Sequence, residues 1–141
     1  MKIWVLLVLM ASSSLVLAQP DQSAQNDQSD LPFSKIVKVG NILYLSGDLG
    51  VKPGTIELVP GGIGPETRQT MENIQATLKA NGSGMDKVIK CLVMLADINE
   101  WAAMNEVYVT FFDTPPARSA LGASGLALDA RMEIECIGVI G

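Results

Sequence analysis

The chain has 141 residues, 48% of them hydrophobic, which suits one ordinary domain with a buried core. Acidic residues outnumber basic ones by 15 to 10, so nucleic acid, whose phosphates attract Lys and Arg, is a disfavoured partner. The sequence contains no histidine, which excludes imidazole bases and Ser/His/Asp triads and removes the usual ligands of most zinc sites.

The first 18 residues have the pattern of a secretory signal peptide. Lys2 precedes the uncharged run Ile3–Met10, and a Ser-rich stretch then ends at Ala18. A membrane anchor is the alternative, but serines interrupt the apolar run, which is short for a span of about 20 residues. We predict cleavage after Ala18 and export, either to the periplasm or out of the cell.

Residues 19–30 are polar and contain almost nothing to bury, which predicts a flexible spacer. The domain proper then spans residues 31–141. No stretch of it approaches a transmembrane length, so we expect the mature protein to be soluble and to have no membrane partner.

The domain opens with a predicted hairpin and a helix. The β-rich runs 36–39 and 42–46 flank the turn pair Gly40-Asn41. A loop rich in Pro and Gly follows, and Pro65 suits the first position of a helix. Apolar residues then repeat at helical spacing until Asn81-Gly82 ends the helix.

A second helix is predicted further along, and both helices carry polar signals. In the first helix, Arg68 and Glu72 are spaced for a surface ion pair. Before the second, Asp97 and Glu100 resemble a capping box, with Asp97 as the N-cap and Glu100 reaching back. The apolar face of the second helix comprises Trp101, Met104, Tyr108 and Phe111. Pro115-Pro116 must stop it.

Three further β-rich runs complete the predicted sheet: Val88–Leu95, Ala117–Leu121 and Arg131–Ile140. The resulting order is ββαβαββ, in which strands outnumber helices. This order predicts an α+β domain with a mixed, mostly antiparallel sheet and two helices on one of its faces.

Arg118 is the strongest candidate functional residue. It follows Pro115-Pro116-Ala117, and the rigid prolines fix where the strand begins and where the guanidinium emerges. The planar guanidinium can donate two parallel hydrogen bonds to a carboxylate, which predicts a small carboxylate ligand. An arginine paired with a surface acid is the alternative interpretation.

The last predicted strand alternates apolar and acidic residues. Glu133 and Glu135 therefore point to one face, and the apolar residues between them point to the other, where they should meet the helices. A carboxylate beside an arginine can orient or activate a water molecule. A solvated strand face is the alternative interpretation.

Weaker candidates lie elsewhere in the chain. Asn105 falls at the edge of the second helix's buried face, where a polar amide should have a partner. Ser46-Gly47-Asp48 offers a hydroxyl and backbone groups at the end of a strand. Cys91 and Cys136 are too few for a Cys-rich metal site, and the sequence leaves open whether they form a disulfide or remain buried thiols.

Together these segments resemble the RidA (YjgF-type) family of reactive-intermediate deaminases, from about Leu31 to Gly141. The most specific parts are Pro116-Ala117-Arg118-Ser119 and, fifteen residues after the arginine, Glu133-Ile134-Glu135. The supporting segments are Val39-Gly40-Asn41 leading into Leu45-Ser46-Gly47, Thr67-Arg68-Gln69 leading into Asn73-Ile74, and Met104-Asn105-Glu106-Val107-Tyr108.

The resemblance implies a chorismate-mutase-like fold and a homotrimer with three clefts between subunits. It also implies the activity of a 2-iminobutanoate/2-iminopropanoate deaminase, a hydrolase that converts 2-imino acids to 2-oxo acids and ammonia. In these terms Arg118 binds the substrate carboxylate, assisted by backbone groups around Ala120, and Glu133 positions the attacking water. The remaining cleft residues would be Phe33, Ser46, Gly47 and Asn105. No metal or cofactor is expected, because a protonated imine is already electrophilic.

Two positions depart from the family pattern. Phe33 stands where a tyrosine is common, and Asp48 stands where a glutamine is common, so the cleft loses a hydroxyl and gains a charge. The alternative function is therefore a non-catalytic trimeric module that binds a small carboxylate or a protein. An endoribonuclease-like activity is a third interpretation, which the acidic balance and the missing histidine disfavour.

Overall fold

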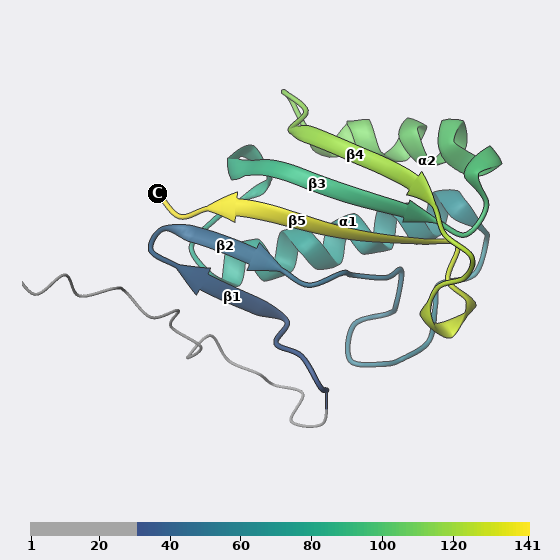
Figure 1. Ribbon diagram of the computed structural model, residues 1–141, viewed down its shortest axis with the longest axis horizontal. Helices are drawn as coiled ribbons and strands as arrows, with labels where there is room; N and C mark the ends of the chain where they lie inside the picture. Colours follow the sequence, from purple (N-terminus) through teal and green to yellow (C-terminus); the bar gives the residue numbers. More distant parts are fainter. Residues whose placement is uncertain (1–30) are drawn as a thin grey trace, which may run out of the picture.

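The computed structural model describes residues 31–141, which form one five-stranded sheet with two helices on one of its faces (Figure 1). The predicted signal peptide, residues 1–18, and the predicted spacer, residues 19–30, lie outside the described residues. Within residues 31–141, no helix is both long enough and apolar enough to cross a bilayer.

The elements follow the predicted order, and short 3-10 turns lie between them. The strands are β1 (Ile36–Val39), β2 (Ile42–Leu45), β3 (Val88–Leu95), β4 (Ala117–Gly122) and β5 (Met132–Val139). The helices are α1 (Ile63–Ala80) and α2 (Trp101–Tyr108).

The sheet is mixed, with the strand order β1-β2-β5-β3-β4. Only β3 and β4 run parallel; the other three neighbouring pairs are antiparallel. A parallel pair needs a crossover connection, and α2 lies in the segment that joins β3 to β4. The predicted α+β fold, with two helices on one face of a mostly antiparallel sheet, is confirmed.

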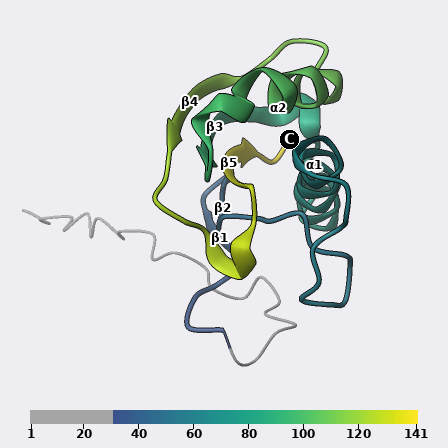
Figure 2. The ribbon, with the colours of Figure 1, turned by 90° about the vertical axis from the view of Figure 1, so that its right-hand side faces the viewer.

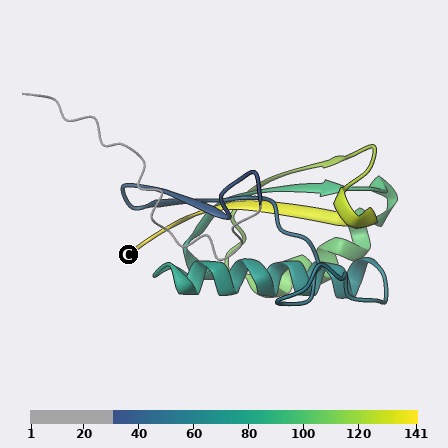
Figure 3. The same ribbon diagram turned by 90° about the horizontal axis from the view of Figure 1, so that it is seen from below.

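The core lies between the sheet and the helices, which occupy the same side of the sheet (Figure 2; Figure 3). The buried residues of β5 include Met132, Ile134 and Cys136. Those of α1 include Met71, Ile74 and Leu78. Alternation along β5 then turns Glu133 and Glu135 toward the opposite face, which no helix of the described part covers. The predicted division of β5 into an apolar and an acidic face is confirmed.

The start of α1 differs from the prediction. The helix begins at Ile63, two residues before Pro65, and its N-cap Gly62 makes no side-chain hydrogen bond. Pro65 is tolerated because the N–H groups of a first helical turn have no intrahelical partner. The Gly-rich loop can lead into the helix because glycine readily adopts backbone conformations that other residues avoid. Gly62, the N-cap, has a positive φ of 87°.

The predicted polar pairs on the helices also differ. Arg68 lies 6.0 Å from the centre of the Phe111 ring, and no ion pair within residues 31–141 joins it to Glu72. Glu100 does not complete a capping box, because its carboxylate binds the Arg131 guanidinium instead. In both cases a partner distant in sequence replaces the local one.

A disulfide joins Cys91 of β3 to Cys136 of β5. The two residues are register partners in the antiparallel pair, with their Cα atoms 4.1 Å apart, and both side chains are buried. Of the two states that the sequence leaves open, the structure contains the disulfide.

Candidate active site

Arg118 is held on the helix-covered face by α2. Its Nη1 donates a hydrogen bond of 2.7 Å to Asn105 Oδ1. The guanidinium carbon lies 4.8 Å from the centre of the Tyr108 ring and 5.7 Å from that of Trp101. Such cation–π contacts orient a guanidinium without neutralising it. Arg118 and Asn105, both predicted site residues, are thus brought together.

Arg118 has no carboxylate partner within residues 31–141, whose ion pairs are Lys35–Asp48, Lys52–Glu57 and Arg131–Glu100. The interpretation of Arg118 as one member of a surface salt bridge is therefore wrong for this part of the chain. A half-buried guanidinium that is oriented by an amide and two rings retains donors for an incoming anion.

Ala120 lies two residues after Arg118 on β4, which is an edge strand of the sheet. About half of the backbone N–H and C=O groups of an edge strand face away from the neighbouring strand. Backbone groups near Ala120 are consequently available beside the guanidinium.

Glu133 forms a second group of predicted site residues, together with Gly47 and Ser46. A Cβ atom at position 47 would stand 1.8 Å from Glu133 Oε1, so the carboxylate occupies the space that any other residue would fill. The neighbouring Ser46 hydroxyl donates a hydrogen bond of 2.7 Å to the Ser34 carbonyl oxygen. The absence of a side chain at Gly47 is therefore what admits the Glu133 carboxylate.

The pKa of Glu133 is raised above its ordinary value. Partial burial is the main cause, and repulsion from the Glu135 and Asp48 carboxylates adds to it. Burial also raises the pKa of Asp48, against the opposing effect of the Lys35 ammonium, which lies 3.6 Å from Asp48 Oδ2. A carboxylate with a raised pKa is a better proton acceptor, which suits a residue that activates water.

Arg118 and Glu133 lie on opposite faces of the sheet. Arg118 is the register partner of Cys91 and bonds to α2, whereas Glu133 is the register partner of Met94 on the uncovered face. Cys91 and Met94 are three positions apart on β3, about 10 Å at roughly 3.3 Å per residue. One copy of the chain therefore does not bring the two predicted catalytic side chains to one substrate.

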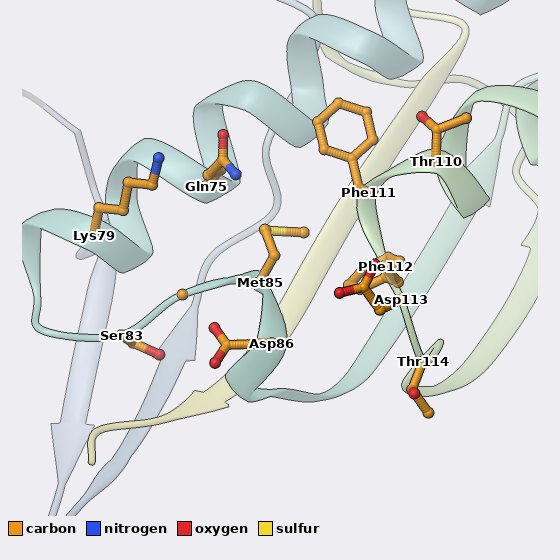
Figure 4. A pocket seen from close by; sticks show the side chains of 11 residues that line it. Gln75, Lys79, Ser83, Met85, Asp86, Thr110, Phe111, Phe112, Asp113 and Thr114 are labelled. Atoms are coloured by element: carbon orange, nitrogen blue, oxygen red, sulfur yellow. The ribbon is translucent and has the colours of Figure 1, made fainter.

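Phe33 is half exposed and shares a pocket with Ser46 and Gly47 of the Glu133 group. This pocket has a volume of about 200 Å³, and Asp48 also lines it. A larger cavity of about 560 Å³ lies at the C-terminal end of α1, where side chains from three segments converge (Figure 4). None of the predicted site residues lines that larger cavity.

Sequence reasoning missed the part that Tyr108 and Trp101 play around Arg118. The periodicity predicts both only as part of the apolar face of α2, yet Trp101 is 38% exposed, and the hydroxyl of the buried Tyr108 has no hydrogen-bond partner within residues 31–141. The available signal was their spacing: Trp101 precedes Asn105 by four residues and Tyr108 follows it by three, so all three share one face.

No metal site accompanies these groups in the part of the chain that is described. Residues 31–141 contain no cluster of three His, Cys, Asp or Glu side chains that could hold a metal ion.

The protein thus has an α+β fold with an oriented arginine on one face of its sheet and a carboxylate of raised pKa on the other. A family model described as Endoribonuclease L-PSP matches residues 24–140. The RutC family protein UK114 of Drosophila melanogaster is 44% identical over 111 residues, covering 78% of this chain and 80% of the relative. A 2-iminobutanoate/2-iminopropanoate deaminase of Mus musculus is 40% identical, covering 78% of this chain and 82% of the relative.

Solved structures of similar proteins share the fold of this chain. RidA from an Antarctic Psychrobacter has a TM-score of 0.76 and 37% identity, with 87% of this chain and 100% of that chain covered. TdcF of E. coli, solved with bound serine, has a TM-score of 0.74 and 35% identity, with 79% and 90% covered. The chain belongs to the Endoribonuclease L-PSP family, the RidA (YjgF-type) family that the sequence resembles.

Proposed function

We propose that the protein hydrolyses reactive 2-imino acids to 2-oxo acids and ammonia, with Arg118 binding the substrate carboxylate and Glu133 positioning water. The observation that carries the proposal is the Arg118 guanidinium, oriented by Asn105 and Tyr108 but without an acidic partner in the described chain. Relatives about 40% identical are named as deaminases of 2-iminobutanoate and 2-iminopropanoate, which supports the same substrate class.

The chemistry requires one water and no external oxidant. Water adds to the carbon of the protonated imine, and Glu133 accepts the proton that the water loses, so a carbinolamine forms. Glu133 returns this proton to the nitrogen, the C–N bond breaks as the C=O bond forms, and ammonia leaves. The released hydroxyl proton makes the second product ammonium. Arg118 fixes the carboxylate throughout, which lowers the entropic cost of aligning the imine carbon with the water.

The proposal includes a cleft shared between copies of the chain in a homotrimer. It is supported by the position of Arg118 and Glu133 on opposite faces of one copy. A second copy whose uncovered face packs against the edge strand β4 can bring its own carboxylate to the first copy's guanidinium. Exposed apolar residues on that face, such as Tyr44 and Leu121, favour such packing.

We also propose that the protein works outside the cytoplasm after removal of residues 1–18. The Cys91–Cys136 disulfide supports export, because structural disulfides persist mainly in oxidising compartments. Measuring the mass of the protein recovered from the periplasm and the medium tests this: a chain that begins at Gln19 is expected. Intact chain found only in the cytoplasm would contradict it.

Generating the imine with an amino-acid oxidase and trapping what escapes with semicarbazide tests the reaction. The wild type should drain the trap, and Arg118→Ala should lose about 100-fold or more in kcat/KM, because two charge-assisted hydrogen bonds are removed. Arg68→Ala is the matched control, since Arg68 also lies over an aromatic ring but belongs to the exposed surface of α1. Equal drainage by wild type and Arg118→Ala would contradict the proposal.

A non-catalytic trimeric module is the second candidate, favoured by Phe33 and Asp48 where the family commonly has tyrosine and glutamine. Calorimetry with small 2-oxo acids separates the two functions. Binding that depends on Arg118, in a protein that does not drain the imine trap, would establish the module and reject the enzyme.

A further inference from the structure

The cavity at the C-terminal end of α1 has a volume of about 560 Å³, within the range of small-molecule sites, and we call it the α1 cavity. Residues from three segments line it: 75–79 of α1, 83–86 before β3, and 110–114 after α2. These segments belong to the helix layer, whereas the proposed trimer uses the uncovered face and β4. The α1 cavity is therefore separate from the groups assigned to the proposed reaction.

Part of the cavity's lining is apolar and already held in place. Met85 is buried, and Phe111 and Phe112 are half-buried. The Phe112 ring packs against the Tyr108 ring with 5.0 Å between their centres, and the Arg68 guanidinium carbon lies 6.0 Å from the centre of the Phe111 ring. Because both rings have partners within the fold, an apolar ligand group would meet a surface that needs little further ordering.

The α1 side of the cavity supplies hydrogen-bond donors. Lys79 and Gln75 are four residues apart, so they project from one face of the helix, as Figure 4 shows. The exposed Lys79 ammonium forms no ion pair within residues 31–141. An ammonium beside an amide N–H₂ group can donate to both oxygens of a carboxylate.

The other two segments supply acceptors. Asp86 and Asp113 are exposed, and neither carboxylate forms an ion pair within the described residues. The hydroxyls of Ser83 and Thr110 each donate a hydrogen bond of 2.7 Å to a backbone carbonyl oxygen. With their protons engaged, these two oxygens have only lone pairs to offer a ligand. This part of the cavity thus suits an ammonium.

Lys79 pairs with neither aspartate, although all three line one cavity. A ligand that carries only an ammonium would be repelled by Lys79, and one that carries only a carboxylate would be repelled by Asp86 and Asp113. A zwitterion places one charge against each set of groups. The arrangement of charges therefore favours a ligand that has both.

We propose that the α1 cavity binds an α-amino acid with an apolar side chain. Its carboxylate accepts from Lys79 and Gln75, its ammonium donates to Asp86 and Asp113, and its side chain packs on the two phenylalanine rings. At about 30 Å³ for each water-sized group, the cavity has room for roughly 18 such groups, so an aromatic or branched side chain fits. The site shares no residue with the proposed reaction, and either can fail without the other.

Calorimetry with four probes tests the proposal: L-phenylalanine, phenethylamine, which lacks the carboxylate, 3-phenylpropanoate, which lacks the ammonium, and glycine, which lacks the side chain. Arg118→Ala is the background, because it removes the guanidinium that could bind a carboxylate in the proposed cleft. The Kd of phenylalanine should lie at least about tenfold below that of each other probe, since each lacks one set of contacts. A phenylalanine Kd that matches that of either single-charge probe would overturn the proposal, as would no binding at all.

Variants of the exposed charges assign each end of the ligand. Lys79→Gln should raise the Kd of phenylalanine and of 3-phenylpropanoate at least about threefold and should not weaken phenethylamine. Asp113→Asn should weaken phenylalanine and phenethylamine by a similar factor and should not weaken 3-phenylpropanoate. Lys38→Gln and Glu72→Gln are the matched controls, because they remove the same charges at exposed positions outside the cavity. Equal effects of the controls and the cavity variants would overturn the proposal.

The backbone amides locate the bound amino acid. In two-dimensional NMR spectra of the Arg118→Ala protein, phenylalanine should shift the amide signals of residues 83–86 and 110–114, and Lys79→Gln should reduce these shifts at the same ligand concentration. Glycine should cause smaller shifts at residues 111 and 112, because it has no side chain to contact the rings. Shifts confined to residues 46–48 and 118–120 would place the ligand in the proposed cleft and overturn the assignment to the α1 cavity.

Discussion

Arg118 Nη1 donates a hydrogen bond of 2.7 Å to Asn105 Oδ1, which joins the edge strand β4 to helix α2 across 13 residues of sequence. The bond fixes the direction of the guanidinium, because the amide oxygen accepts from one end of the fork while the Tyr108 ring lies against its face. An amide fulfils this role without adding charge. A carboxylate in the same place would neutralise the cation that the substrate needs.

Two substitutions of Asn105 should therefore reduce activity to different extents. Asn105→Ala should reduce kcat/KM about tenfold, since one hydrogen bond to a charged group is lost and Arg118 becomes less ordered. Asn105→Asp is nearly isosteric but should be worse than Asn105→Ala, because its carboxylate competes with the substrate for the guanidinium. The imine-trapping assay measures both, and Glu106→Ala, an exposed neighbour on α2, serves as the control. An Asn105→Asp variant with normal activity would show that Arg118 binds no carboxylate.

Because Arg118 and Glu133 lie on opposite faces of the sheet in one copy, we expect inactive variants of the two residues to complement each other in a mixed trimer. Arg118→Ala and Glu133→Gln should each be inactive alone, but trimers that contain both variant chains should regain activity. Whichever way the chains are mixed, one cleft in three combines an intact guanidinium with an intact carboxylate, which gives about one third of wild-type activity. Co-expression with two affinity tags and tandem purification supplies the mixed trimers. Mixed trimers no more active than the single variants would contradict a shared cleft.

Substitution of Gly47 should reduce the enzyme's activity much more than its stability. An alanine Cβ there would stand 1.8 Å from Glu133 Oε1, and the cheapest response is for the flexible end of Glu133 to move away. We expect Gly47→Ala to lose most of its kcat and to keep a melting temperature near that of the wild type. Gly64→Ala is the matched control, because the nearest atom to its Cβ is Val107 Cγ2 at 3.9 Å. A large loss of stability with unchanged kcat in Gly47→Ala would contradict this account.

The raised pKa of Glu133 predicts the direction in which kcat/KM should depend on pH. The carboxylate must be ionised to accept a proton, so activity should fall as the pH drops through a value above the usual pKa of a glutamate. Glu135→Gln removes a like charge and lowers the pKa of Glu133, so the acid limb of kcat/KM should move to lower pH. Comparing variants on one substrate cancels the titration of the imine itself. Glu72→Gln, on the exposed side of α1, should leave the profile in place.

Much of the fold could be predicted because it is encoded locally. The period-two pattern around Glu133 assigns the faces of β5, and the period of α1 assigns Met71, Ile74 and Leu78 to the core. The start of α1 at Ile63 was missed because glycine conformations, rather than a capping side chain, determine it.

The candidate site was harder to predict than the fold. A separation of fifteen residues between Arg118 and Glu133 carries no information about which face each occupies, since this depends on strand pairing and on the parallel register of β3 with β4. The ring contacts of Arg118 and the pairing of Glu100 with Arg131 are likewise non-local. Periodicity identifies residues on one element, but not the partners that other elements bring to them.

The Cys91–Cys136 disulfide should contribute to stability and not to catalysis. It closes a loop with a sequence separation of 45 residues, for which restriction of the unfolded chain corresponds to about 4 kcal/mol. Cys91→Ala combined with Cys136→Ala should lower the free energy of unfolding by up to that amount and leave kcat unchanged at 25 °C. Urea unfolding of the wild type with and without a reductant separates the loss of the cross-link from the loss of packing. Because both sulfur atoms are buried, the reductant should act only on chains that have opened, so native protein should resist it. Identical unfolding midpoints for the oxidised and the fully reduced wild type would show that the bond adds nothing to stability.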